Sequence, residues 1–143
     1  MRQGARYPGH ALSQNSTLES LSLRLNRMGD DGGVRLCRGL AQNRTLQRLS
    51  MAGNGLEYEF AIELLPVLRS HPALQAVDLS SNGVPEEAGT EVVKAVVNNR
   101  RLLAVDVRYN EFSEVDLEVL EDLVKDRQNQ GSLTRAQVFE PLL

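Results

Sequence analysis

One pattern of residues recurs four times in this chain at a constant spacing of 28 positions, without a gap or an insertion. Each copy places aliphatic residues at three positions and an asparagine at a fourth, as in LQAVDLSSNGV at 74–84 and LLAVDVRYNEF at 102–112. The two earlier copies are LESLSLRLNRM at 18–28 and LQRLSMAGNGL at 46–56. Because periodic sequences fold into equivalent units that stack on their neighbours, this pattern predicts a solenoid.

The aliphatic positions of each copy predict a short strand with one buried face. Two of them, such as Leu21 and Leu23, flank a single polar residue, which is the spacing of a β-strand. The asparagine follows where the chain turns away from the sheet and leaves backbone groups in need of partners. An asparagine side chain can both donate and accept hydrogen bonds, so the sequence predicts a ladder that ties each turn to its neighbour. Its members are Asn26, Asn54, Asn82 and Asn110.

The second half of each unit has helical spacing. Apolar residues recur at i, i+3, i+4 and i+7, which buries one face of a helix of about 10–14 residues. A small residue, Gly33 or Gly89, opens two of these stripes, and we expect helix and strand to approach most closely there. Residues that favour helix N-termini predict where the helices begin, at Asp30, Pro85 and Ser113.

The repeat resembles the leucine-rich repeat, which is written L-x-x-L-x-L-x-x-N-x-L. Its length, with a full helix in each unit, is similar to the ribonuclease-inhibitor subclass. The resemblance implies an α/β leucine-rich-repeat solenoid with parallel strands on the concave face and helices on the convex face. It implies three parts: a remnant of an upstream repeat or cap at 1–17, four repeats at 18–128, and a C-terminal tail at 129–143.

The first residues depart from the repeat. The segment SQNSTL at 13–18 echoes AQNRTL at 41–46, so it is expected to close a helix of an earlier unit. Pro8 and Gly9 stand where that helix would need apolar residues. The sequence therefore predicts that residues 1–10 do not form a normal repeat helix, which leaves either a truncated array or a first strand covered by another polypeptide.

Composition is typical of one soluble domain. The chain has 143 residues, of which 41% are hydrophobic and 24% charged, and it has no apolar run long enough to span a membrane. The single cysteine, Cys37, lies on the apolar stripe of the first repeat helix and is expected to be a buried free thiol. One cysteine and no recognisable secretory signal indicate a reducing, cytoplasmic compartment.

Few residues suit catalysis. His10 and His71 are isolated, and His71 occupies the helix-ending position that Asn43 and Asn99 hold in other units. The sequence has no glycine-rich phosphate-binding motif, no paired cysteine or histidine at metal spacing, and no nucleophile elbow. We expect no enzymatic activity, no cofactor, no metal site and no small-molecule substrate.

Charge is unevenly distributed. Residues 1–70 hold nine arginines against six acidic residues, whereas residues 71–143 hold seven basic residues against thirteen acidic ones. The arginines are scattered and no aromatic platform interleaves with them, so we expect no nucleic-acid binding. The acidic residues between 111 and 126 fit either a basic partner or a solvated surface.

The residues between the buried strand positions form the inner surface of the predicted sheet. Most are small and polar, but the last unit places Arg108 and Tyr109 there, and these residue types often dominate binding energy. The alternative is that Tyr109 only shields the turn at Asn110. We expect partner proteins to bind at this C-terminal end, and the candidate contact residues are Arg108, Tyr109, Glu118, Phe139 and Leu142.

Within the leucine-rich-repeat family, the stretch LSLRLNRMGDDGGVRLCRGL at 21–40 is most similar to the leucine-rich-repeat subunit of the ciliary nexin–dynein regulatory complex. This resemblance implies a noncatalytic scaffold within a larger axonemal assembly of a cilium or flagellum. The same repeat subclass includes the Ran GTPase-activating protein, so the alternative is a GTPase-activating or other regulatory protein of the cytoplasm. In that alternative Arg27 is the candidate residue for contacting the GTPase. Actin-capping tropomodulins and innate-immune sensors resemble the same family.

Overall fold

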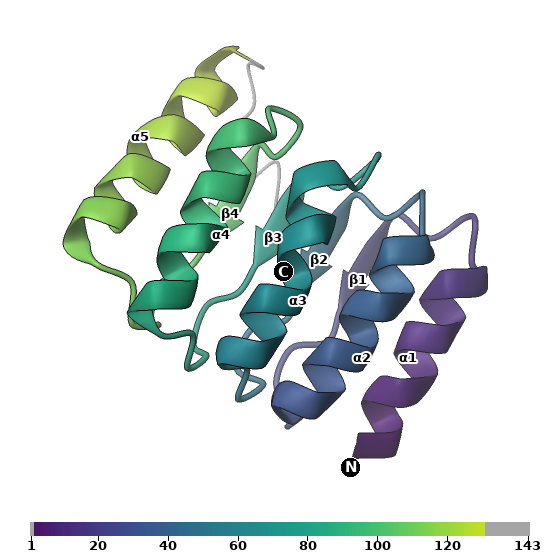
Figure 1. The fold of residues 1–143 in the computed structure, drawn as a ribbon. Coiled ribbons are helices and arrows are strands. Elements are labelled where there is room, and N and C mark those ends of the chain that lie inside the picture. Colours follow the sequence, from purple (N-terminus) through teal and green to yellow (C-terminus); the bar gives the residue numbers. More distant parts are fainter. Residues whose placement is uncertain (1, 131–143) are drawn as a thin grey trace.

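The computed structural model describes residues 2–130, with side chains from residue 8 onward. Helices and strands alternate along this part of the chain (Figure 1). The elements in chain order are α1 (Arg2–Gln14), β1 (Ser20–Ser22), α2 (Gly29–Gln42), β2 (Arg48–Ser50), α3 (Tyr58–Ser70), β3 (Ala76–Asp78), α4 (Glu86–Asn98), β4 (Ala104–Asp106) and α5 (Glu114–Gln130).

The strands form one parallel sheet in the order β1-β2-β3-β4. Leu21 lies opposite Leu49, which lies opposite Val77, which in turn lies opposite Val105, so the spatial register equals the 28-residue spacing of the sequence. The helices line up side by side on one face of this sheet (Figure 1). The predicted α/β leucine-rich-repeat solenoid, with strands on the inner face and helices on the outer face, is confirmed.

A continuous apolar core fills the space between the sheet and the helices. It forms because α2, α3 and α4 each turn an i, i+3, i+4, i+7 stripe toward the aliphatic strand positions, and no single unit could bury these residues alone. Gly33 lies at a contact with the next repeat and not, as expected, with a strand, since a Cβ atom there would come within 2.5 Å of Leu56 Cδ2 and 2.6 Å of Phe60 Cδ1. Fully buried core residues include Phe60, Leu36, Leu40, Leu46, Leu49, Leu56, Leu64, Leu68, Leu74 and Leu79.

The start of α3 is capped by the preceding helix. The Asp30 carboxylate, in the first turn of α2, accepts hydrogen bonds from the backbone N–H groups of Glu57 (2.8 Å), Glu59 (3.0 Å) and Phe60 (3.0 Å). These N–H groups have no partner inside their own helix, and a carboxylate also interacts favourably with the positive end of the helix dipole. The residue at the N-cap of α3, Glu57, makes no side-chain capping bond. Asp30 therefore connects two repeats, a role that its place in the sequence did not predict.

The expectation that residues 1–10 do not form a repeat helix is wrong. Residues Arg2–Gln14 form α1, which includes Pro8 and packs beside α2 as the other helices pack beside their neighbours (Figure 1). Leu12 is buried in the common core. A proline in a helix removes one backbone hydrogen bond, so this helix depends on its contact with α2.

Close approach of the two backbones explains how α1 packs. A Cβ atom at Gly39 would collide with the carbonyl of Gly9, and one at Gly9 would lie 2.8 Å from the carbonyl oxygen of Arg35. The repeat pattern marked Gly9 as a missing apolar residue. The structure shows instead that two glycines let the helices meet backbone to backbone.

Candidate functional site

The asparagine turns join consecutive repeats. The Asn54 Oδ1 atom accepts hydrogen bonds from the backbone N–H groups of Asn26 (2.9 Å) and Met28 (3.3 Å) in the preceding unit. Its Nδ2 atom donates to the carbonyls of Leu23 (2.9 Å) and Met51 (3.0 Å), one from each unit. A single buried side chain thus provides partners for backbone groups of two turns.

Asn82 makes the same contacts one unit further along. Its Oδ1 atom accepts from the N–H groups of Asn54 (2.9 Å) and Leu56 (3.1 Å), and its Nδ2 atom donates to the carbonyls of Met51 (3.1 Å) and Leu79 (3.0 Å). These bonds connect the second and third units on the edge of the sheet where the strands end.

The two outer members of the ladder differ from each other. Asn110 reaches back to the third unit, accepting from the N–H of Val84 (3.0 Å) and donating to the carbonyl of Leu79 (2.8 Å). The side chain of Asn26 is exposed, and within residues 2–130 it donates only to the carbonyl of Arg24 (3.2 Å). The other three asparagines each bind the unit before them, whereas the described residues ahead of Asn26 contain no earlier strand turn for it to bind.

A second column of polar side chains lies at the opposite end of the strands, where each helix ends. The Oδ1 atom of Asn43 accepts from the N–H groups of Thr45 (3.0 Å) and Leu46 (2.8 Å), and its Nδ2 atom donates to the carbonyl of Leu12 (3.0 Å) in α1. Asn99 similarly donates to the carbonyl of Leu68 (2.7 Å). The asparagine of this column recurs in the AQNRTL and SQNSTL segments of the sequence. From the sequence it predicted only the ends of helices, and not these hydrogen bonds between repeats.

Arg127 occupies this column on the last helix. Its Nη1 atom lies within hydrogen-bond distance of the carbonyls of Val96 (2.9 Å), Asn99 (3.0 Å) and Leu102 (2.8 Å), and its Nη2 atom donates to the carbonyl of Val97 (3.1 Å). A guanidinium carries five donors and no acceptor, so it suits a cluster of carbonyl groups at a helix C-terminus. Arg127 thereby anchors α5 to the end of α4 and the start of β4.

His71 takes the same place in the second repeat. It is buried, and its Nδ1 atom accepts hydrogen bonds from the N–H groups of Ala73 (3.1 Å) and Leu74 (3.1 Å), which requires Nδ1 to be unprotonated. Burial lowers the pKa of His71. The carbonyl of Asn43 faces the ring and partly offsets this effect, although it makes no hydrogen bond of good geometry with Nε2.

We predict that acidification destabilises the fold through His71. Because its pKa is lower in the folded state, the unfolded chain takes up the proton first as the pH falls below about 6.5. The neutral imidazole contributes its full stability above that pH, and the contribution is lost between there and the lower folded-state pKa, by at most about 1.4 kcal/mol per pH unit. Urea denaturation at a series of pH values between 7.5 and about 5 measures this slope.

The matched variant is His71→Asn, which places the residue of Asn43 and Asn99 at the equivalent position. An asparagine keeps an acceptor for the two N–H groups and has no proton to gain in this pH range. The variant should match the parent at neutral pH and lose less stability on acidification. An equal pH dependence in both chains would show that His71 does not cause the effect.

The turns that follow the strands share a left-handed backbone conformation. Leu25, Gly53, Ser81 and Tyr109 have φ angles of 57°, 66°, 59° and 62°. Only glycine adopts this region without strain, so the other three are held there by the surrounding turn. Leu25 is 71% exposed and Tyr109 is 77% exposed, which places one large apolar side chain in solvent at each end of the row. The exposure of Tyr109 does not support a shielding role over the turn at Asn110.

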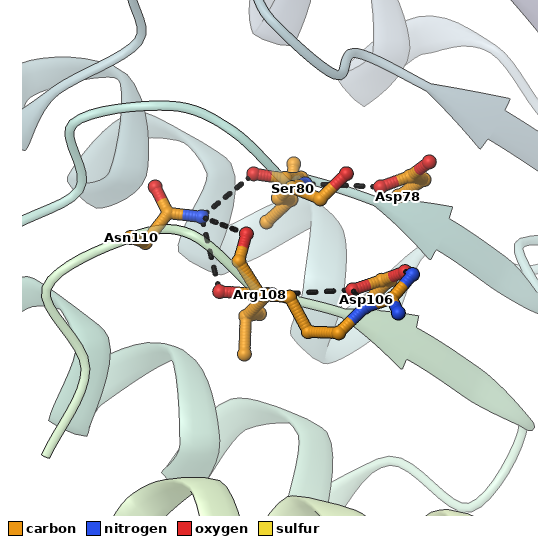
Figure 2. A network of polar contacts seen from close by, with 7 residues as sticks. Asp78, Ser80, Asp106, Arg108 and Asn110 are labelled. Carbon is orange, nitrogen blue, oxygen red and sulfur yellow. Dashed lines mark hydrogen bonds and ion pairs between the residues drawn. The ribbon is translucent and has the colours of Figure 1, made fainter.

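Arg108 is held beside Tyr109 by a paired carboxylate. Its Nε and Nη2 atoms bind the two oxygens of Asp106 at 3.0 Å and 2.8 Å, while its side chain remains more than half exposed (Figure 2). Asp106 is buried and also accepts from the backbone N–H of Arg108. This pairing raises the pKa of Arg108 above its ordinary value, with smaller contributions from Tyr109 and Asp78. A two-point contact fixes the plane of the guanidinium and leaves its remaining N–H groups for a partner.

The predicted partner-binding residues are only partly brought together. Arg108 and Tyr109 are adjacent at the end of β4, and Glu118 is exposed on α5. Within residues 2–130 no hydrogen bond or ion pair joins Glu118 to the other two. Phe139 and Leu142 lie outside the described residues.

A groove between β4 and α5 was missed by sequence reasoning. It has a volume of about 550 Å³ and lies where a fifth strand would continue the sheet. The sequence feature that could have predicted this groove is the end of the repeat pattern, since Gln130 stands in the position of the opening leucine. Its lining includes Ala104, Val107, Arg108, Leu117, Val124 and Gln128.

The part of the chain from residue 2 to residue 130 shows two further features that bear on function. None of its helices combines the length and hydropathy needed to cross a membrane, and it contains no cluster of three or more potential metal-binding side chains. Cys37 is buried, and burial, with smaller effects from Glu63 and Asp30, raises the pKa of its thiol.

Comparisons with known proteins agree with this geometry. The family model described as Leucine Rich repeat matches residues 14–37 and 42–62. The fold is similar to the C-terminal domain of tropomodulin from Caenorhabditis elegans, with a TM-score of 0.65 and 12% identity over 90% of this chain and 95% of that one. It is also similar to a structure titled Leiomodin-1 Actin-Binding Site 2, with a TM-score of 0.64 and 12% identity over 96% of each chain. Among the curated proteins, none matches the sequence significantly.

Proposed function

We propose that this chain is a noncatalytic protein–protein interaction module whose principal docking surface lies at its C-terminal end. The observation that supports this proposal is the exposed pair of Arg108 and Tyr109. Tyr109 projects from a constrained backbone, and Arg108 is oriented by Asp106, so neither residue loses much freedom when a partner binds. Tyrosine and arginine at such positions often contribute most of the binding energy.

The partners in this proposal are other proteins of a larger assembly, and not nucleic acid, membrane lipid or a small-molecule substrate. The assembly is the nexin–dynein regulatory complex of a ciliary or flagellar axoneme. The support for this finer assignment is the resemblance of residues 21–40 to the leucine-rich-repeat subunit of that complex. A solenoid with a docking surface at one end suits a fixed structural component, because its rigid repeats set the distance between neighbours.

Co-sedimentation of the purified protein with salt-stripped ciliary axonemes tests the proposal. The double variant Arg108→Ala, Tyr109→Ala is expected to weaken binding by about 30-fold or more, as truncation of hot-spot residues typically does. The matched control is Arg24→Ala with Leu25→Ala, which removes the exposed residues at the equivalent positions of the first repeat. Equal weakening by both pairs, or no binding to axonemes by the parent chain, would contradict the proposal.

Two other functions are tested in parallel. The leiomodin structure carries the name of an actin-binding site, so filamentous actin serves as a second sedimentation target. A likeness at 12% identity supports the shared fold alone, so actin binding is an alternative outcome. The GTPase-regulating alternative depends on Arg27, which is exposed in the first strand-to-helix turn. A GTP hydrolysis assay with the parent chain and with Arg27→Ala would reveal that activity.

A further inference from the structure

Each repeat binds the next repeat through the same backbone N–H groups. Two of these groups lie just after the strand, and they donate to carbonyl groups of the following unit. In the third unit the donors are Leu79, which binds the carbonyl of Asp106 (2.8 Å), and Ser81, which binds the carbonyl of Arg108 (2.9 Å). The equivalent donors of the first two units, which bind in the same way at 2.8–3.1 Å, are Leu23, Leu25, Met51 and Gly53.

Further N–H groups of each turn bind the asparagine of the next unit. In the second unit they belong to Asn54 and Leu56, which donate to the Oδ1 atom of Asn82 at 2.9 Å and 3.1 Å. In the third unit Val84 donates to the Oδ1 atom of Asn110 at 3.0 Å. A unit therefore presents a constant set of donors to the unit that follows it.

The same donors in the fourth unit face the open side of β4. They are the N–H groups of Val107, Tyr109, Asn110 and Phe112, and within the described part of the chain none of them has a hydrogen-bond acceptor. Val107 is 4% exposed and Phe112 is 8% exposed, so little water reaches these two residues. Buried N–H groups in folded proteins nearly always have a partner. The last repeat thus ends in the unused binding groups for one more strand and turn.

The groove between β4 and α5 lies beside these donors. Its volume is about 550 Å³, and α5 lines it with the apolar side chains of Leu117, Leu120 and Val124. Gln128 also lines the groove; it is 9% exposed, and its Nε2 atom has no partner among residues 2–130. The groove therefore combines apolar contacts on its helix side with unpaired donors on its strand side.

The charged residues that line the groove pair with each other. Arg108 lies 2.8 Å from Asp106, and Lys125 lies 3.4 Å from Glu121. The two pairs leave no net charge, so the groove favours an uncharged segment over an acidic or a basic one. A helix would not suit the strand edge, because its backbone groups already bind one another and would leave the four donors unpaired.

We infer that the β4 edge binds an extended, uncharged segment of a partner protein, which joins the sheet as a fifth parallel strand. Its carbonyl groups accept from Val107 and Tyr109, and its alternate apolar side chains contact α5. An asparagine three positions after the last of these accepts from Asn110 and Phe112. In such strand addition the main-chain bonds supply affinity and the alternate side chains supply specificity. The inference rests on the proposed docking at the C-terminal end and names the kind of segment bound there.

A synthetic peptide tests this inference on the full chain. The probe is residues 74–84 with Asp78→Ser and blocked ends, which is uncharged and carries the strand, the turn and the asparagine of the third unit. We expect saturable binding by fluorescence anisotropy, and at least about tenfold weaker binding when the peptide also carries Asn82→Ala. No binding at peptide concentrations up to about 1 mM, or equal binding of the two peptides, would overturn the inference.

Two substitutions on α5 locate the bound peptide. Leu117→Glu places a carboxylate in the apolar side of the groove and should weaken binding at least about tenfold. Val119→Glu is the matched control, because Val119 lies on the same helix at a similar exposure, 40% against 37%, and does not line this groove. Equal weakening by the two substitutions would contradict the position of the added strand.

Amide hydrogen exchange, followed by NMR, examines the edge without any substitution. In the free full chain we expect the N–H groups of Val107 and Phe112 to exchange at least about tenfold faster than those of Leu79 and Leu56, and the peptide should protect them. Slow exchange of Val107 and Phe112 in the free chain would show that the edge already has a partner, and would overturn the inference.

The peptide and the axonemes give separate answers. A chain that sediments with axonemes but does not bind the peptide contradicts this inference and leaves the proposed function intact. A chain that binds the peptide but does not sediment with axonemes supports the strand-binding edge and contradicts the proposed axonemal assembly.

Discussion

Replacing Gly39 with alanine is expected to lower the free energy of unfolding by about 2–3 kcal/mol, although alanine is the better helix former. The added Cβ atom would collide with the backbone carbonyl of Gly9, and a backbone group cannot rotate away as a side chain can. The whole of α1 would have to move, which would uncover Leu12 and the core residues below it. The measurement is the shift in urea midpoint, together with proteolysis of residues 2–14 under native conditions.

The control for this prediction is Ala41→Gly, an exposed position on the same helix. Because this side chain is exposed, removal of its methyl group should cost about 1 kcal/mol or less through helix propensity. Gly39→Ala adds a methyl group to α2 and Ala41→Gly removes one, and both substitutions are expected to destabilise the fold. If Gly39→Ala stabilises the chain, the backbone contact between α1 and α2 is not as close as the structure shows.

Replacing Asn82 with alanine is expected to cost about 3 kcal/mol, because it leaves buried N–H and carbonyl groups of two repeats without their partners. The lost bonds are those from the N–H groups of Asn54 and Leu56 and those to the carbonyls of Met51 and Leu79. Hydrogen exchange should locate the increased opening at the turns of the second and third units.

Asn26→Ala is the matched variant, since it changes the same residue type at the same position of the first unit. Its exposed side chain makes one described hydrogen bond, to the carbonyl of Arg24, so we expect a loss of about 0.5 kcal/mol or less. Equal shifts in urea midpoint for Asn26→Ala and Asn82→Ala would show that these asparagines do not couple neighbouring repeats.

The N-terminal helix shows where prediction from the sequence failed. Apolar periodicity detects side chains that fill a core, and Pro8 with Gly9 broke that period. The contact of α1 with α2 depends instead on the absence of side chains at Gly9 and Gly39. These residues are far apart in the sequence. A glycine in a helical pattern is interpreted as a helix breaker unless its neighbour in the folded structure is known.

The polar contacts show a similar division. The asparagine of each turn could be singled out because it recurs at one position, and its position in the structure follows from the repeat. From the sequence, Asp30 was assigned only to the first turn of its own helix. Its carboxylate also caps α3, because the stacking of repeats brings the start of the next helix within hydrogen-bond distance. His71 and Arg127 replace asparagine in the helix-end column with different chemistry, and only their distances to backbone atoms reveal the shared role.

By itself the sequence determined the architecture of the repeats: the parallel register, the helix stripe and the position of each turn. Repetition makes this possible, since each unit contacts mainly its neighbours and four in-phase copies specify the same local structure. The tertiary structure alone decided which equivalent positions are exposed and which are buried. Ser50 is buried and Ser22 is exposed because β2 has a strand on each side and β1 has one on one side only. The contact of Gly9 with Gly39 joins two helices that are far apart in the sequence, and a local pattern carries no signal for such a contact.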